Sequence, residues 1–327
     1  MNDAPRRDRG WFDGFQHRHF DVAGQQIFAR FGGDANAPAL LLLHGFPETH
    51  AMWNRVARTL SAHFFVVTPD LRGCGDSSKP VGSPDHVNYS KRVMAADVRG
   101  VMDALGVDSL FVCGHDRGGR VAHRLALDHP DRVDMLCVID IAPTLDMYDA
   151  TDMAFATAYY HWFHLIQPAP LPEFMIGGDP ISYLHATLGA LGGRGLDHIE
   201  PIALAEFERC FTPDAIRGMC EDYRASAGID LVHDRQSREL GQRIRCDMHV
   251  LWAARGIVQR FFRPLDLWQA QCAGSVTGQP MPSGHFIPEE LPSATAAALV
   301  RFLTGGLTPN PSPDAGRRTK HEIGATS

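Results

Sequence analysis

Residues 114–119 read GHDRGG and lie between an apolar run, SLFVC at 109–113, and a helix-like stretch, RVAHRLALDHP at 120–130. Two glycines that each stand two positions from a central residue are typical of a sharp strand-to-helix turn that displays a nucleophile, usually serine. The central residue in this chain is Asp116. The stretch therefore predicts a strand, a tight turn and a helix, with a carboxylate displayed at the turn.

Short apolar runs on both sides of this turn predict further buried strands. They occupy 39–45, 64–70, 110–116, 135–143 and 248–254, and residues 20–33 alternate as a hairpin would. The stretches at 90–107 and 119–133 carry apolar residues three and four positions apart, which is typical of helices. Strands that alternate with helices predict an α/β fold with a mostly parallel sheet and right-handed crossovers.

The strand pattern stops between about 145 and 240, where aromatic residues, histidine, proline and glycine are frequent. We interpret this segment as a mainly helical cap domain inserted into the sheet domain. The predicted division is an N-terminal tail at 1–10, a core domain at 11–144 and 241–304, a cap at 145–240, and a C-terminal tail at 305–327. The C-terminal tail has too few apolar residues to pack and is expected to be disordered.

The composition excludes several classes of partner. The 327 residues are 44% hydrophobic, and a net charge of -7 is spread along the chain, so neither a nucleic-acid surface nor a membrane-binding helix is expected. No apolar signal-peptide core follows the first residues, which makes the cytoplasm the expected location. The seven cysteines show no CxxC or CxxH spacing, so neither a disulfide framework nor a metal site is predicted.

In a parallel sheet the ligand site forms at the carboxyl ends of the strands. Asp116 and Asp140 each end an apolar run, the sequence HGFP at 44–47 follows another, and His285 stands in a late loop. These residues supply a nucleophile, an acid and a base, with Asp140 as the orienting partner of His285. Asp266 is the alternative acid, because it is the first carboxylate after the run at 248–254.

An aspartate at the turn indicates chemistry at saturated carbon. A serine that displaced a halide would form an ether, which water cannot cleave through a carbonyl. A carboxylate forms an ester instead, and water activated by a histidine can hydrolyse it. Asp116 therefore points to opening of an epoxide or displacement of a halide.

Arg117 and Arg120 favour the halide. They stand three residues apart at the start of a helix, so they share a face that also has the partial positive charge of the helix N-terminus. A substrate carboxylate held bidentately there would place the neighbouring carbon before Asp116, which suits a short 2-haloacid and not a neutral epoxide. The alternative is that one arginine pairs with a surface acid such as Asp128.

The chain resembles the haloacetate dehalogenases, including fluoroacetate dehalogenase, of the α/β-hydrolase superfamily. The resemblance runs from about Trp11 to Leu303. The string GHDRGxR at 114–120 is the most specific part, since related epoxide hydrolases and haloalkane dehalogenases usually have tryptophan at the position of Arg117. The other matching motifs are HGFPE at 44–48, DLRGCGDS at 70–77, YYHWFH at 159–164, CEDYRA at 220–225 and SGHF at 283–286.

The resemblance implies an α/β-hydrolase fold with a helical cap, no cofactor, a homodimer, and a short 2-haloacid such as fluoroacetate or chloroacetate as substrate. It implies that Arg117 and Arg120 clamp the substrate carboxylate. The departing halide would be bound by His161, Trp162 and Tyr223. We also expect the backbone N–H groups of Phe46 and Arg117 to form an oxyanion hole, as the turn geometry suggests.

Two other functions remain open at this stage. An epoxide hydrolase would use the same Asp116 with two cap tyrosines, Tyr223 and either Tyr159 or Tyr160. Its neutral substrate would not explain the presence of the two arginines, Arg117 and Arg120. A non-catalytic ligand sensor on a hydrolase scaffold would not need an intact nucleophile, acid and base. One departure from similar proteins is Ala253-Ala254 in the stretch WAARG at 252–256, where Trp-Gly-Ala-Arg-Gly is usual, and we expect it to affect local packing more than chemistry.

Overall fold

The computed structural model describes residues 11–193 and 195–305 and contains one eight-stranded sheet, ordered β1-β2-β4-β3-β5-β6-β7-β8. The first two neighbour pairs, β1 with β2 and β2 with β4, are antiparallel, and every later pair is parallel. The strands are β1 Gln16–Val22, β2 Gln25–Gly32, β3 Ala39–Leu43, β4 Phe65–Pro69, β5 Leu110–His115, β6 Val133–Ile139, β7 Asp247–Ala253 and β8 Val276–Met281. The mostly parallel α/β fold predicted from the sequence is confirmed.

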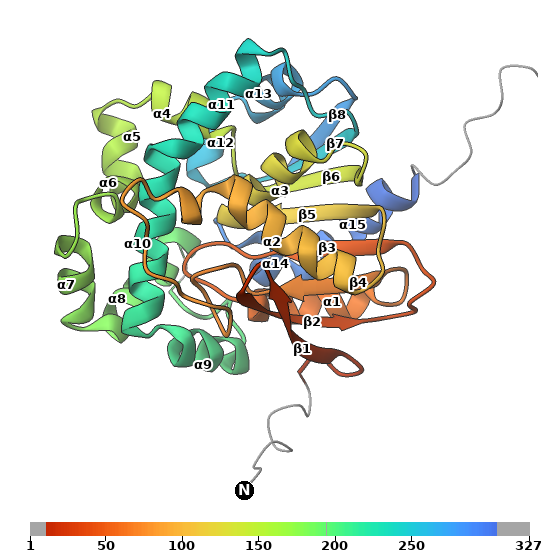
Figure 1. Ribbon diagram of the computed structural model, residues 1–327, viewed down its shortest axis with the longest axis horizontal. Helices are drawn as coiled ribbons and strands as arrows, with labels where there is room; N and C mark the ends of the chain where they lie inside the picture. Colours follow the sequence, from red (N-terminus) through yellow and green to blue (C-terminus); the bar gives the residue numbers. More distant parts are fainter. Residues whose placement is uncertain (1–10, 194, 306–327) are drawn as a thin grey trace, which may run out of the picture.

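Helices cover both faces of the sheet (Figure 1). Leu40 and Leu42 of β3 face a core cluster that contains residues of α1 and α15, whereas Leu41 and Leu43 face a second cluster with α2 and α3. This two-sided burial explains why the central strands are continuous apolar runs. The helices of the sheet domain, on both faces together, are α1 Asn54–Leu60, α2 Lys91–Ala104, α3 Arg117–Asp128, α12 Ile257–Phe261, α13 Pro264–Gln271, α14 Ile287–Glu290 and α15 Pro292–Gly305, with the short 3₁₀ segments η1 His50–Trp53 and η2 Val87–Tyr89.

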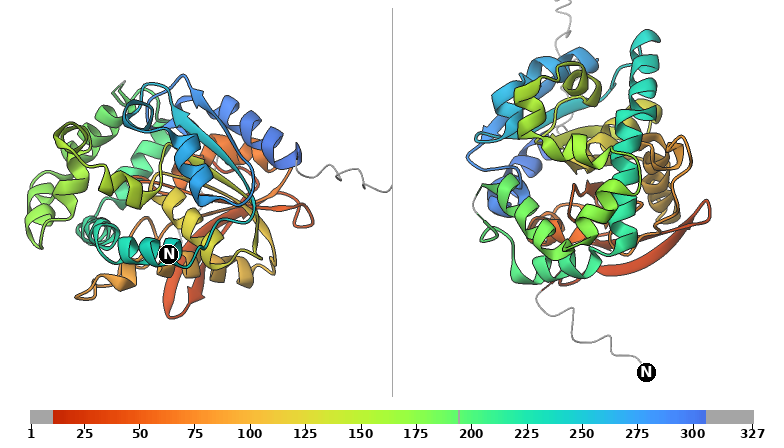
Figure 2. Two further views of the ribbon diagram at one scale, coloured as in Figure 1. Left: turned by 90° about the horizontal axis from the view of Figure 1, so that it is seen from above. Right: turned by 90° about the vertical axis from the view of Figure 1, so that its left-hand side faces the viewer.

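The chain between β6 and β7 forms a helical insertion, as the sequence predicted (Figures 1 and 2). Residues of the insertion, such as Trp162, Phe207 and Tyr223, belong to the same buried cluster as Leu40 and Leu42, so the insertion packs on the sheet domain without a break in the core. Its helices are α4 Thr144–Asp149, α5 Met153–Ala158, α6 Tyr160–Leu165, α7 Leu171–Gly177, α8 Pro180–Gly192, α9 Pro201–Cys210, α10 Pro213–Ala227 and α11 Ile229–Glu239.

The exact domain boundaries stay a prediction. The N-terminal tail at 1–10 and residues 306–327 of the predicted C-terminal tail lie outside the described residues, while Gly305 ends α15. Among the described helices, none is both long and apolar enough to cross a membrane.

Candidate active site

The site is built around the turn between β5 and α3. Asp116 stands alone between the two elements with φ 46° and ψ −113°, a conformation that is strained for a residue with a side chain. Close packing around the turn requires glycine: a Cβ on Gly118 would lie 2.5 Å from the backbone of Leu43, and one on Gly45 would lie 2.7 Å from the Cβ of Asp116. The strand, turn and helix predicted from GHDRGG are therefore present, and the turn displays the carboxylate.

The structure brings Asp140 and His285 to this carboxylate. Asp140 directly follows β6, and His285 stands in the loop after β8. The Nδ1 of His285 lies 2.6 Å from Oδ2 of Asp140, and its Nε2 lies 4.0 Å from Oδ2 of Asp116. The alternative acid, Asp266, is an exposed residue of α13. The acid beside His285 is thus Asp140.

The second oxygen of Asp140 is also held. The backbone N–H of Ala253, at the end of β7, donates to Oδ1 of Asp140 at 2.9 Å. This contact uses only the main chain of Ala253, whose small side chain is fully buried. The unusual Ala253-Ala254 pair therefore leaves the orientation of Asp140 intact.

The charges around Asp116 keep it ionised. Burial raises the pKa of its carboxyl group, but the nearby charges of His285, Arg120 and Arg117 outweigh burial and hold that pKa well below its usual range. Burial lowers the pKa of His285, whereas the hydrogen bond and charge of Asp140 raise it, and the net pKa is raised. The arrangement therefore pairs an anionic group with a histidine of increased basicity.

A backbone donor faces the displayed carboxylate. The N–H of Phe46, in the loop after β3, donates to Oδ1 of Asp116 at 3.1 Å. The N–H of Arg117 begins α3 directly after Asp116, where amides have no acceptor within the helix. Both amides that we expected to form an oxyanion hole therefore lie beside Asp116.

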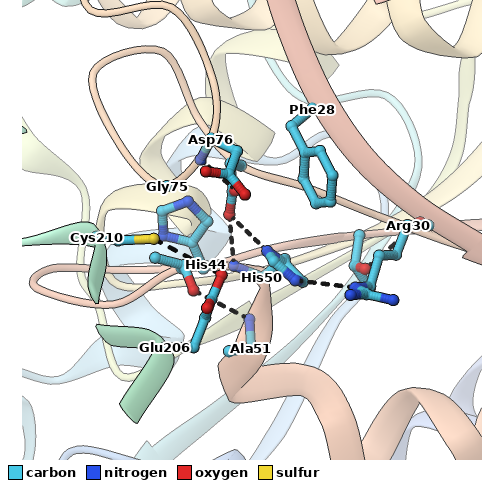
Figure 3. A network of polar contacts seen from close by, with 12 residues as sticks. Phe28, Arg30, His44, His50, Ala51, Gly75, Asp76, Glu206 and Cys210 are labelled. Atoms are coloured by element: carbon cyan, nitrogen blue, oxygen red, sulfur yellow. Dashed lines mark hydrogen bonds and ion pairs between the residues drawn. The ribbon is translucent and has the colours of Figure 1, made fainter. Parts of the chain in front are cut away.

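A buried polar network supports the loop that carries Phe46 (Figure 3). The backbone N–H and Nδ1 of His50 lie 2.8 and 2.9 Å from Oδ1 of Asp70, and Nε of Arg30 donates to Nε2 of His50 at 3.1 Å. Because Nε2 accepts, the proton of His50 is on Nδ1 and points to Asp70. The N–H of Asp76 donates to the second oxygen, Oδ2, of Asp70. The sequence motif at 70–77 thus holds the loop after β3, a role that we had not predicted.

The two arginines are buried, each 3% exposed, and most of their donors are already bound. Nε of Arg117 donates to Oδ2 of Asp222 at 2.7 Å, and its Nη2 donates to the carbonyl oxygen of Asp222 at 2.9 Å. Nη1 of Arg120 donates to Oγ1 of Thr144 at 2.8 Å. Nη1 of Arg117 and Nε of Arg120 have no partner within the described residues.

These contacts correct two expectations. Asp128 pairs with Arg92 and Arg124, so it does not occupy the arginines at the site. Arg117 does pair with an acid, but that acid is Asp222 on cap helix α10. Neither arginine therefore has two free donor nitrogens with which to bind one carboxylate bidentately. Within the described chain, the nitrogens that remain free for a ligand are Nη1 of Arg117 and Nε of Arg120.

Aromatic residues of the cap close the site. His161 and Trp162 come from α6, and Tyr223 comes from α10; all three are buried. The ring of His161 stacks on that of Phe46 with centroids 5.7 Å apart, and the guanidinium carbons of Arg117 and Arg120 lie 4.1 and 4.6 Å from the ring centroids of Tyr223 and Trp162. Two of the predicted halide ligands, Trp162 and Tyr223, therefore lie against the arginines, and the third, His161, lies against Phe46.

These cap residues are neutral hydrogen-bond donors. Burial lowers the pKa of His161 to about 3, and it raises the pKa of Tyr223 well above its usual value, so neither is charged near neutral pH. Nε1 of Trp162 and the hydroxyl of Tyr223 have no partner in the part of the chain that the structure describes. Buried donors of this kind suit a small anion that has lost its water.

The tyrosines of the alternative function differ in their surroundings. Tyr159 is buried, and its ring stacks on Trp162 with centroids 5.4 Å apart. Tyr160 is 54% exposed. Of these two residues, only Tyr159 is therefore enclosed near Tyr223.

A cavity of about 460 Å³ lies against His285 and Asp140. Asp140 and His285 form part of its wall, together with His161 and Tyr159, and residues of α8 and 255–257 complete it. Small molecules such as water can therefore reach His285, while Asp116 and the two arginines do not form part of the cavity wall.

Behind His285 lies a second group of buried polar residues that we did not foresee. Nε2 of His115 donates to the carbonyl oxygen of His285 at 2.9 Å, and Nδ1 of His115 lies 3.4 Å from Oε2 of Glu48. Burial lowers the pKa of His115 to about 4 and raises that of Glu48 to about 8. Near neutral pH Glu48 is therefore mostly protonated and His115 neutral, and a second buried carboxyl with a raised pKa, that of Glu289, lies beside Glu48. The glutamate that follows HGFP is the only sequence signal for this group.

Comparison with known proteins places the fold and the site in context. A family model described as "alpha/beta hydrolase fold" matches residues 38–182. A fluoroacetate dehalogenase from Burkholderia sp is 44% identical over 294 residues, which cover 90% of this chain and 95% of that protein. The chain belongs to the α/β-hydrolase family.

Other α/β hydrolases resemble the chain over most of its length. A soluble epoxide hydrolase from Corynebacterium sp. (strain C12) is 31% identical over 81% of this chain and 89% of that protein. The crystal structure of a protein from Nostoc sp PCC 7120 superposes with a TM-score of 0.86 at 50% identity, covering 90% of this chain and 99% of that one. The chain is thus an α/β hydrolase related both to fluoroacetate dehalogenase and to epoxide hydrolases.

Proposed function

We propose that this α/β hydrolase cleaves the carbon–halogen bond of short 2-haloacids, such as fluoroacetate or chloroacetate, and releases a halide and a 2-hydroxyacid. The observation that carries the proposal is the pair of buried donors, Nη1 of Arg117 and Nε of Arg120, that have no partner among the described residues beside Asp116. A substrate carboxylate would accept from both and leave its neighbouring carbon before the nucleophile. The identity to a fluoroacetate dehalogenase supports the same reaction.

In the first step Oδ2 of Asp116 attacks the carbon that bears the halogen. Oδ1 already accepts from the N–H of Phe46, so Oδ2, which faces His285, is the oxygen available for attack. The new carbon–oxygen bond forms as the carbon–halogen bond breaks, and the bonding electrons leave with the halide. Attack in line with the leaving group inverts a chiral carbon.

The halide would leave into the group of cap donors. His161, Trp162 and Tyr223 supply neutral N–H and O–H groups in a buried environment. Fluoride is small and strongly hydrated, so a site that replaces its water with several directed donors makes it a better leaving group.

In the second step His285 removes a proton from water, which attacks Cγ of the aspartyl ester. Negative charge then develops on Oδ1 of Asp116, where the N–H of Phe46 already lies at 3.1 Å. The intermediate collapses, the 2-hydroxyacid leaves as an alkoxide, and the proton on His285 passes to it. Asp140 stabilises the imidazolium that forms between these two transfers. Asp116 is left as a carboxylic acid and loses the second proton of the water to solvent, which restores its carboxylate.

Epoxide opening is the second candidate, because the chain is also related to epoxide hydrolases and because Tyr159 and Tyr223 are both buried near the site. The arginine donors weigh against it. A neutral epoxide has no negative group to accept from them, so Nη1 of Arg117 and Nε of Arg120 would stay buried without an acceptor among the described residues.

The test is halide release from fluoroacetate and chloroacetate, measured side by side, with Asp116→Asn as the blank and a neutral epoxide as a third substrate. Release of fluoride or chloride by the wild type alone supports the proposal. Turnover of the epoxide without halide release would reject it in favour of the second candidate. No turnover of any substrate would favour the ligand sensor.

A single turnover in heavy-oxygen water tests the covalent route. The ester mechanism places the label in Asp116 and unlabelled oxygen in the 2-hydroxyacid. Label that appears first in the product would show direct attack by water and reject the ester.

A further inference from the structure

We propose that Asp222 is a positioning residue for the substrate carboxylate: it binds one side of the Arg117 guanidinium and thereby leaves Nη1 as the donor that faces the substrate. This inference rests on the proposed function for the identity of the ligand. It concerns a residue of the cap that does not itself touch the reacting atoms.

Asp222 binds two of the three guanidinium nitrogens of Arg117. Nε and Nη2 both point to Asp222, where they bind Oδ2 and the carbonyl oxygen, and Nη2 also binds Oγ of Ser226. Nη1 is the nitrogen left over, and it is buried without a partner in the described chain. Because the guanidinium is planar and rigid, fixing one edge fixes the direction of the remaining donor.

Asp222 is itself held from the core. Its Oδ1 binds Nζ of Lys91, the first residue of α2, while its Oδ2 binds Arg117. The backbone N–H of Lys91 donates to Oδ1 of Asp230 at 2.8 Å, and Nζ of Lys91 lies 3.7 Å from Oδ2 of Asp230. Both carboxylate oxygens of Asp222 are thus in use, so an amide at this position would lose one of the two contacts.

The four charged side chains of this cluster, which includes Asp222, are buried, and each must therefore be paired with an opposite charge. The side chains of Lys91, Arg117, Asp222 and Asp230 are 5%, 3%, 11% and 6% exposed. Charges in such surroundings are tolerated only when they are paired and hydrogen-bonded. The negative charge of Asp222 keeps Arg117 protonated and offsets part of its positive field, so the contribution of Asp222 to substrate binding is the direction of Nη1 and not an increase in charge.

The same turn of α10 carries both Asp222 and Tyr223. Asp222 binds the guanidinium edge, and the ring of Tyr223 lies under its face, with the guanidinium carbon 4.1 Å from the ring centroid. The packing of α10 on the core therefore determines the positions of two groups at once: Nη1 of Arg117, the proposed carboxylate donor, and the hydroxyl of Tyr223, a predicted halide donor. A substrate carboxylate can be held correctly only when this helix is in place.

The experiment measures binding of acetate and of chloride to full-length wild type and to Asp222→Asn by calorimetry. Acetate probes the carboxylate site, and chloride probes the cap donors. We expect the Kd of acetate to rise about tenfold, because one charge-assisted hydrogen bond to Arg117 is weakened, while the Kd of chloride changes less than about twofold. Under turnover, KM for the haloacid should rise more than kcat falls.

Glu221→Gln is the matched control. Glu221 is the neighbour of Asp222 on the same helix, but it binds Arg224 and His86 instead of Arg117. Its replacement should leave the Kd of acetate unchanged. Asp222→Glu keeps the carboxylate and should restore part of the acetate binding that Asp222→Asn loses.

Two results would overturn the inference: an unchanged Kd of acetate in Asp222→Asn, or an equal weakening of acetate and chloride, which a purely structural role would produce. If Asp222→Asn does not fold, Ser226→Ala removes a smaller contact of Arg117 and must still weaken acetate more than chloride. Binding does not depend on turnover. Wild type that binds acetate but releases no halide would therefore contradict the proposed reaction and leave this inference standing.

Discussion

Replacing Asp140 by asparagine should slow the hydrolysis of the ester while the first step continues. The carboxylate of Asp140 accepts from Nδ1 of His285 at 2.6 Å, and its other oxygen is fixed by the N–H of Ala253. Asparagine keeps the shape of the side chain and removes its charge. The imidazolium that forms when His285 takes a proton from water then loses its main stabilising partner.

The size of the effect follows from this one contact. A hydrogen bond to a charged group contributes about 1.5–3 kcal/mol net. Each 1.4 kcal/mol changes a rate about tenfold, so hydrolysis should become about 10- to 100-fold slower. The pH profile should move as well. Asp140 raises the pKa of His285, and the step needs neutral His285, so the acidic limb of the rate profile should shift to lower pH in the variant.

The assay is rapid quenching followed by intact-protein and peptide mass spectrometry. In Asp140→Asn the carboxymethyl ester of Asp116 should accumulate during turnover of chloroacetate. Asp266→Asn is the control, because Asp266 is the exposed alternative acid and should behave as wild type. The reasoning is refuted if Asp266→Asn shows the defect, or if Asp140→Asn is slow without accumulating the ester.

Three further changes test other parts of the site. Trp162→Phe removes a buried N–H but keeps an aromatic ring, so the rate of fluoride release should fall about tenfold and the rate of chloride release by less. Ion-selective electrodes measure both rates, and an equal fall for the two halides would contradict a role in leaving-group stabilisation. Arg120→Met removes the free Nε donor and should raise KM for fluoroacetate at least about tenfold in steady-state assays; an unchanged KM would argue against carboxylate binding. Burial raises the pKa of Glu48 from 4.5 to about 8, so the folded protein retains a proton that the unfolded chain loses, and wild-type stability declines as pH rises through that window. Glu48→Gln should lose part of this decline, because Glu289, whose pKa burial and Glu48 also raise, still titrates. In urea unfolding the variant should therefore gain stability over wild type as pH rises, and parallel pH profiles would disprove the assignment.

The sequence predicted most of the sheet because its central strands are buried on both faces. The continuous apolar runs at 39–45 and 110–116 became β3 and β5, in which every residue is buried. Strand β8, Val276–Met281, was not predicted. It is a half-exposed edge strand that contains Gly278 and Pro280, so it shows neither a continuous apolar run nor regular alternation.

The positions at strand ends were predictable for a related reason. Asp116 and Asp140 directly follow apolar runs, and parallel strands bring such residues to one edge of the sheet. Asp222 and Glu48 gave no comparable signal, because a charged residue on a helix or in a loop usually faces solvent. Only the packing of α10 on the core shows that Asp222 is buried and that it determines which nitrogen of Arg117 remains free.

The division of the site between sheet domain and insertion has a consequence for how the proposed halide and carboxylate donors can change. The predicted nucleophile, base and both arginines lie outside the segment between β6 and β7, whereas the predicted halide donors all lie inside it. In the proposed reaction, changes in that segment that spare Asp222 and Thr144 would alter the groups that bind the halide and leave the carboxylate donors in place. Exchanging this segment among related hydrolases, with Asp222 retained, would show whether the proposed halide donors can be changed separately from the proposed carboxylate donors.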